Sequence, residues 1–122
     1  MNKVFTEDAP GAIGPYSQGY IANGFVFTSG QIPVDPISGY IPDGIRSQAE
    51  QCCKNVKAII EASGSSMEKV VKTTCFLADM NDFAEFNMVY ETCFVGKPAR
   101  SCVAVKQLPK NVLCEIEAIA VL

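Results

Sequence analysis

The chain has 122 residues, of which 48% are hydrophobic and 19% charged, and its formal net charge is −3. This length suits one domain over residues 1–122 with an ordinary buried core, and the composition excludes a disordered tail. The acidic balance and the lack of a Lys/Arg cluster argue against a nucleic-acid partner.

The first ten residues lack the apolar segment of a secretory signal, and no run approaches the roughly 20 apolar residues of a membrane span. We therefore expect a cytoplasmic protein without a membrane partner. Its six cysteines should then stay reduced, and most should serve as small core residues. The chain contains no histidine, which excludes Ser–His and Cys–His nucleophilic dyads and most zinc sites.

The first predicted element is a β-hairpin. Asn23-Gly24 is a strong turn signal, so residues 19–21 and 25–29 should pair as antiparallel strands. Prolines and glycines then mark a turn-rich loop over residues 33–42. The chain should leave the sheet there before its first helix.

A helix is predicted over residues 45–63, because its apolar residues recur at steps of three and four and form one stripe. Asp43 is the predicted N-cap, and Gly64 the residue that ends the helix. Ser65 and Glu68 resemble a capping box, which predicts one more short turn.

The second half should contain one more helix among three strands. Asp79 or Asn81 can cap that helix. The predicted elements are a strand over residues 70–77, a helix over 82–94, and strands over 99–105 and 113–121.

The order β-β-α-β-α-β-β predicts an α+β domain whose mostly antiparallel or mixed sheet carries both helices on one face. Phe25, Phe27, Val103 and Val105 would help to make the other face too apolar for water. We therefore expect an oligomer in which sheets pack against each other.

The last two strands carry the most reactive grouping. If they pair as a hairpin around residues 108–109, Arg100 lies opposite Glu117 and Cys102 opposite Glu115, with all four on one face. One interpretation is a structural ion pair between Arg100 and Glu117. The other is an anion site, in which the arginine binds a carboxylate and a glutamate holds water or takes a proton. Spacing alone leaves both open.

Two glycine-containing segments, residues 14–18 and 28–33, also invite two interpretations. They could be ordinary turns beside strands. Alternatively, their glycines let the backbone approach a ligand, whose oxygen atoms would accept from exposed N–H groups. Tyr16 would add a phenol and an apolar ring face.

Together these segments strongly resemble the RidA or YjgF family, the reactive intermediate deaminases. The matching segments are GPYSQ at 14–18, TSGQIP at 28–33, VKTT at 71–74, NDF at 81–83, PARSCV at 98–103, LPK at 108–110 and EIEAIA at 115–120. The resemblance runs in order over nearly the whole chain.

The resemblance implies a chorismate-mutase-like homotrimer with a central barrel of sheets, helices outside and ligand clefts between subunits. It implies hydrolysis of 2-iminobutanoate and 2-iminopropanoate to 2-keto acids and ammonia, without cofactor or metal. By motif, Arg100 would bind the substrate carboxylate and Glu115 would position the water. The remaining implied site residues are Cys102, whose backbone lines the pocket, and Tyr16, Ser29 and Gly30 from the other side of the cleft.

One departure from the family pattern precedes the arginine motif. The loop before Pro98 is several residues shorter than usual in the family, and Lys97 stands directly before the proline. Two alternative functions also stay open. A regulatory protein could bind a 2-keto acid at the same arginine without turnover, and some relatives are described as ribonucleases or translation inhibitors. The acidic charge and missing histidine argue against RNA cleavage.

Overall fold

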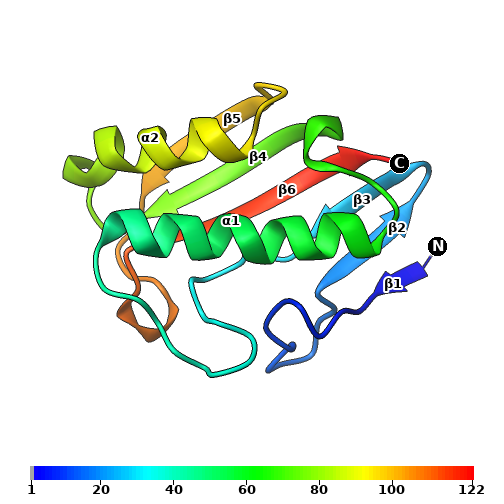
Figure 1. Cartoon of the computed structure of the whole chain (residues 1–122), viewed down its shortest axis with the longest axis horizontal. Coiled ribbons are helices and arrows are strands. Elements are labelled where there is room, and N and C mark those ends of the chain that lie inside the picture. The colour runs from blue at the N-terminus through cyan, green and yellow to red at the C-terminus, as the bar shows by residue number, and fades with distance from the viewer. Residues whose placement is uncertain (1) are drawn as a thin grey trace.

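The computed structural model describes residues 2–122, which form one six-stranded sheet with two α-helices packed on one face (Figure 1). This confirms the predicted α+β class. The elements are β1 (Asn2–Val4), β2 (Gly19–Ala22), β3 (Phe25–Thr28), α1 (Ile45–Ala62), β4 (Val70–Leu77), α2 (Phe83–Cys93), β5 (Ala99–Ala104) and β6 (Cys114–Val121), with 3₁₀ turns η1 (Met67–Lys69), η2 (Met80–Asp82) and η3 (Pro109–Asn111). Strand β1 was not predicted.

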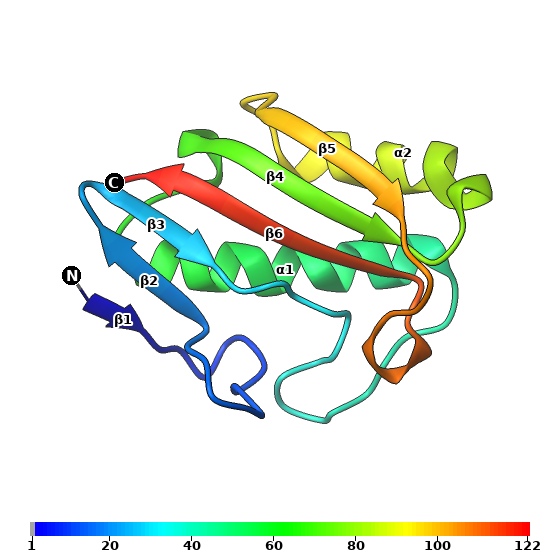
Figure 2. The same ribbon diagram turned by 180° about the vertical axis from the view of Figure 1, so that it is seen from behind.

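The strand order is β1-β2-β3-β6-β4-β5, and only β4 and β5 run parallel within this described sheet (Figure 2). The predicted hairpin of the last two strands is therefore wrong, because β4 lies between β5 and β6. Helix α2 connects β4 to β5, and a strand–helix–strand unit places its strands side by side in parallel. The sheet is mixed, as expected.

The predicted hairpin at the start of the sheet is confirmed. Strands β2 and β3 pair from Gly19↔Thr28 to Ala22↔Phe25. The two turn residues, Asn23 and Gly24, have φ values of 52° and 81°. A two-residue turn with both φ values positive matches the right-handed twist of the flanking strands, which explains why this dipeptide closes it.

Helix ends were predicted less well than helix bodies. Gly44, with φ of 85°, is the N-cap of α1, and no side chain caps this end, so the expected Asp43 cap is wrong. Gly64 follows the helix with φ of 91°, as predicted. Asp79 accepts from the backbone N–H of Asn81, and so caps the η2 turn that leads into α2.

The short turn predicted after α1 is present, but not as a capping box. Ser66 is the N-cap of η1, and its side chain makes no cap hydrogen bond. The hydroxyl of Ser65 instead donates to the carbonyl of Val121 at the end of β6. This contact ties the end of the helical layer to the sheet.

The core lies between the sheet and the two helices. It is built from the apolar stripe of α1, from α2 and from the inward residues of β4 and β6, which alternate with more exposed ones. On the opposite face, Tyr20, Phe25, Phe27 and Val103 are 38–47% exposed. That face is open and apolar in one copy of the chain, as the sequence indicates.

All six cysteines are free thiols, four of them buried and two, Cys93 and Cys102, half-buried. Among residues 2–122, no three His, Cys, Asp or Glu side chains gather as they would around a metal ion. The described helices are also too short or too polar to cross a membrane.

Asn55 fastens the loop between β3 and α1 to the helix. Its side chain is fully buried, and its Nδ2 donates to the carbonyls of Ile32 (3.1 Å) and Val34 (2.9 Å). Gln51 Nε2 donates to Asn55 Oδ1 at 2.9 Å. The Ile32 carbonyl also accepts from the backbone N–H of Val34, so the buried amide adds a second donor to Ile32 and supplies the donor for Val34.

We predict that Asn55→Leu lowers the free energy of unfolding by about 1–3 kcal/mol, because the Val34 carbonyl loses its donor and the Ile32 carbonyl loses one of two donors. Urea unfolding followed by circular dichroism measures this. Lys54→Leu, at the exposed neighbouring position, is the matched control and should change stability by less than about 0.5 kcal/mol. An unchanged urea midpoint for Asn55→Leu would contradict the assigned role.

Candidate active site

Arg100 lies on the edge strand β5 and extends beneath α2. It pairs with Thr73 of β4, which is buried on the helix side of the sheet. The guanidinium stacks over the rings of Tyr90 (4.6 Å to the centroid) and Phe83 (5.4 Å). One of its nitrogens donates to Asn87 Oδ1 at 2.7 Å. These helix residues are spaced i, i+4 and i+7, so one face of α2 holds the arginine.

The contacts that fix the Arg100 guanidinium leave most of its N–H donors free. In the described part of the chain, Asn87 is its hydrogen-bond partner and no carboxylate is paired with it. The aromatic contacts are cation–π interactions, which consume no N–H group. A fixed arginine with spare donors can bind a carboxylate through two parallel hydrogen bonds.

The structure excludes one of the two interpretations, the ion pair between Arg100 and Glu117. Arg100 lies beside Thr73 of β4, whereas Glu117 lies beside Thr74. Successive residues of a strand point to opposite faces, so the two charges are on opposite sides of the sheet. Residues two positions apart on a strand share a face, so Cys102 and Glu115 are separated in the same way.

Cys102 therefore does not share a face with Glu115, contrary to the prediction. Cys102 pairs with the buried Cys75 and lies on the helix side with Arg100. Burial is the main reason that the pKa of the Cys102 thiol is raised. This thiol is therefore poorly suited to act as a nucleophile, and its backbone is the part that a ligand at the strand edge could use.

Glu115 lies on the opposite, outer face of the sheet, against Gly30. A Cβ added to Gly30 would overlap a carboxylate oxygen of Glu115, so a larger residue here would displace that carboxylate from its place. Reciprocal backbone hydrogen bonds between Gln31 and Ile116, of 2.8 and 3.1 Å, hold the two segments together. The glycine segment was expected to approach a ligand closely. Here its Gly30 approaches Glu115, a candidate catalytic residue.

Ser29 joins the segment that holds Tyr16 to the segment that holds Gly30. The Ser29 hydroxyl donates to the carbonyl of Ser17, and its N–H donates to Gln18 O at 2.8 Å. These bonds fix the segment 14–18 against the end of β3, so the two glycine-containing segments meet as one surface.

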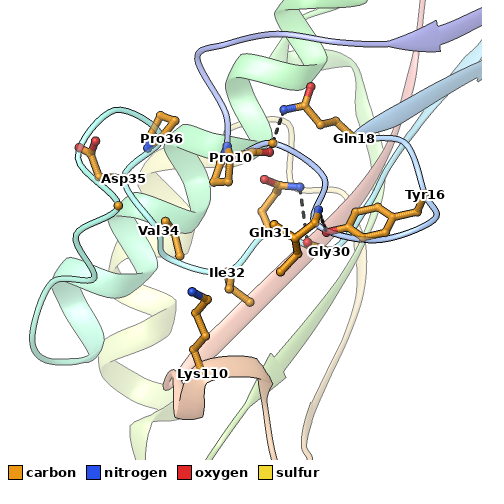
Figure 3. A pocket seen from close by; sticks show the side chains of 13 residues that line it. Pro10, Tyr16, Gln18, Gly30, Gln31, Ile32, Val34, Asp35, Pro36 and Lys110 are labelled. Atoms are coloured by element: carbon orange, nitrogen blue, oxygen red, sulfur yellow. Dashed lines mark hydrogen bonds between the residues drawn. The ribbon is translucent and has the colours of Figure 1, made fainter.

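A cavity of about 220 Å³ opens beside this surface (Figure 3). Tyr16 and Gly30 line it, and Lys110 extends from the η3 turn toward Ile32 on its wall. Gln18 Nε2 donates to three carbonyls of the preceding loop, which closes one side. Sequence reasoning missed Lys110 as a lining residue, because its place depends on how three separate loops meet.

The candidate groups therefore form two half-sites in one chain. The arginine half-site consists of Phe83, Asn87, Tyr90, Arg100 and Cys102. The glutamate half-site consists of Tyr16, Ser29, Gly30 and Glu115. Sequence reasoning missed Asn87. Its i, i+4, i+7 spacing with Phe83 and Tyr90 puts all three on one face of α2, and a β4–α2–β5 unit would place that face over β5.

Known proteins match this chain over almost its whole length. The sequence profile described as Endoribonuclease L-PSP matches residues 6–122. The 2-iminobutanoate/2-iminopropanoate deaminase of Salmonella typhimurium is 53% identical over 122 residues, covering 97% of this chain and 95% of that protein. The crystal structure of Escherichia coli TdcF with bound serine has a TM-score of 0.97 at 50% identity, covering 100% of this chain and 99% of that one. The YjgF gene product of E. coli has a TM-score of 0.96 at 50% identity, covering 99% and 98%.

The pKa of Glu115 is raised above its ordinary value of 4.5, first by burial and second by repulsion from Glu117. A raised pKa means that the ionised form is disfavoured in the folded state. Wild-type stability therefore falls as pH rises from the unfolded pKa through the folded one.

We predict that Glu115→Gln has a higher melting temperature than wild type at pH 7, and that the gain vanishes near pH 4, where both states of the wild type are largely protonated. Thermal unfolding at the two pH values measures it. Glu91→Gln, on the exposed side of α2, is the control and should show no such gain. A Glu115→Gln protein that is less stable at pH 7 would refute this reading of its surroundings.

Proposed function

The chain belongs to the RidA or YjgF family, and from this premise we propose that it hydrolyses 2-iminobutanoate and 2-iminopropanoate to 2-keto acids and ammonia. One observation carries the proposal most directly. Arg100 is held in place by uncharged groups, with donors free for the carboxylate that every 2-imino acid carries.

The reaction needs little chemical equipment from the protein. The C=N carbon of a protonated imine is already electrophilic, so water can attack it to give a carbinolamine. Proton transfer to nitrogen then lets ammonia leave, and the carbon keeps its oxygen as a ketone. The protein has to orient substrate and water and move protons, which a chain without histidine can do.

Arg100 and Glu115 are the proposed catalytic residues. Arg100 binds the substrate carboxylate, while Glu115 positions the water and takes up or returns a proton. A carboxyl whose pKa is raised exchanges protons near neutrality more readily than an ordinary one. The backbone of Cys102 lines the arginine side, and Tyr16, Ser29 and Gly30 supply the opposite wall.

A complete site on this proposal needs two copies of the chain. Arg100 and Glu115 point to opposite sides of one sheet, so the arginine half-site of one subunit meets the glutamate half-site of the next. We propose a homotrimer whose sheets form a central barrel, with a cleft at each subunit boundary. The open apolar face of the sheet and the 52% exposure of Tyr16 support this arrangement.

We place the reaction in the cytoplasm, on a small-molecule substrate. Six free thiols suit a compartment that keeps cysteine reduced. The related TdcF structure holds serine, a small acid with a carboxylate. That observation also favours a second candidate, a sensor that binds a 2-keto acid without turnover. Ammonia release separates the two, because a sensor would not accelerate it.

Ribonuclease activity is the weaker alternative, although the matching profile is described in those terms. The net charge of −3 offers no attraction to a phosphate backbone. RNA cleavage that survives stringent purification and disappears in Arg100→Ala would support it instead.

We predict that Arg100→Ala lowers kcat/KM for imine hydrolysis by roughly 30-fold or more, because losing a charged partner of a bound carboxylate costs about 2–5 kcal/mol. A threonine dehydratase generates 2-iminobutanoate, and semicarbazone formation reports the imine that escapes hydrolysis. Arg46→Ala, at an exposed position on α1, is the control with unchanged activity. Wild-type activity in Arg100→Ala would reject the assigned role.

We also predict that two inactive variants restore activity when they share an oligomer. Co-expression of Arg100→Ala with Glu115→Gln gives mixed rings, in which roughly a quarter of the boundaries combine an intact arginine with an intact glutamate. The rate per site should therefore recover to about a quarter of wild type. A mixture no more active than the average of its two parents would exclude a shared site.

A further inference from the structure

A second groove lies on the helical side of the molecule, away from both half-sites. It has a volume of about 460 Å³ and runs between α1 and the C-terminal end of α2, which lie side by side over the sheet (Figure 1). Cys53 from α1 and Cys93 from α2 both line it. The proposed hydrolysis uses neither residue.

The two thiols meet across the helix interface. Cys93 is the last residue of α2 and is half-buried, while Cys53 is only 3% exposed. Both side chains line the same groove, and Thr92 Oγ1 lies 3.7 Å from the Cys93 sulfur. A half-buried thiol on α2 therefore faces the same groove as a buried thiol on α1.

The pKa values of the two thiols are shifted in opposite directions. The pKa of Cys93 is lowered to about 6, and the hydrogen bond from Cys53 is the largest cause. The same bond and burial raise the pKa of Cys53. These opposite shifts favour a thiolate at the half-buried Cys93 and a protonated thiol at Cys53, which is the arrangement of a reactive and a resolving cysteine.

Charged side chains around the groove nearly cancel. Lys57 lowers the pKa of Cys93 and Glu50 raises it. The further charged groups that line the groove are Lys54 and Glu61 of α1 and Glu68 of η1. Two lysines face three glutamates, so the thiol–thiol contact and not the local field distinguishes Cys93.

The other cysteine contact is different in kind. Cys52 and Cys114 lie 3.7 Å apart, but both are fully buried between α1 and β6. Burial raises the pKa of Cys52 well above its ordinary value. A reagent in solvent reaches neither sulfur, which makes Cys52 a matched control for its chain neighbour Cys53.

We propose that Cys53 and Cys93 form a redox site, in which a hydroperoxide oxidises the dithiol to a disulfide joining α1 to α2. The Cys93 thiolate attacks one peroxide oxygen, the O–O bond breaks, and the departing oxygen takes a proton to leave as water or an alcohol. The resulting sulfenic acid is attacked by Cys53 sulfur as that thiol loses its proton. The S–O bond breaks, and the released hydroxide leaves as water. Two sulfurs supply the two electrons that reduce the peroxide.

Hydrogen peroxide is the probe, added in equimolar amount to the reduced full chain at pH 7. Intact mass should fall by two hydrogens, and peptide mapping should find Cys53 joined to Cys93. Cys52→Ala should form the same disulfide, whereas Cys93→Ser should not. In Cys53→Ala the sulfenic acid has no resolving thiol, so dimedone should label Cys93 when peroxide is added at pH 9, where the thiol ionises without help from Cys53. A disulfide or dimedone adduct at other cysteines, with Cys93 unmodified, would overturn the proposal.

A second measurement uses unsubstituted protein and does not depend on any variant folding. The initial rate of bromobimane alkylation at Cys93 should rise with pH around a midpoint near 6. The other five cysteines should react at least tenfold more slowly at pH 7. Equal labelling of Cys93 and Cys102 would refute the reactive thiolate. Imine hydrolysis enters neither test, so failure here leaves the proposed function untouched.

Discussion

The direction of each candidate group depends on the position of β4 between β5 and β6. Thr73 sets the side of the sheet on which Arg100 lies, and Phe76 sets the opposite side for Glu115. Strand β4 is itself anchored from above, because Thr73 Oγ1 and the Tyr90 hydroxyl lie 2.7 Å apart in the buried layer. A single buried polar contact therefore joins the strand that orients the arginine to the helix that holds it.

Helix α2 acts as a rigid support for the arginine half-site. The chain returns from α2 to β5 through a tight turn in which Lys97 has φ of 52° and donates its N–H to the Phe94 carbonyl. Phe94 is buried, and a Cβ on Gly96 would approach the Glu68 carbonyl to 2.9 Å. The connection from α2 to β5 is thus packed on both sides, which leaves Arg100 little freedom at its base.

Local signals in the sequence predicted local structure well. The Asn23-Gly24 turn, the apolar stripe of α1 and the positive φ of Gly64 each depend on neighbouring residues, and each is present. The strand order depends on contacts between distant parts of the chain. Strands β5 and β6 are neighbours in sequence, but each pairs with β4 and not with the other. The same limit applies to the site: its residue types were visible, but their distribution over two faces depended on which strand lies in the middle.

If Arg100 of one copy and Glu115 of the next form one reaction centre, as proposed, their places on opposite sides of the sheet also fix how many centres an assembly can contain. Copies joined head to tail in an open row would always leave one unmatched surface at each end. Only a closed circle gives as many centres as subunits. Closure of the ring would then set the stoichiometry of the enzyme as well as its stability.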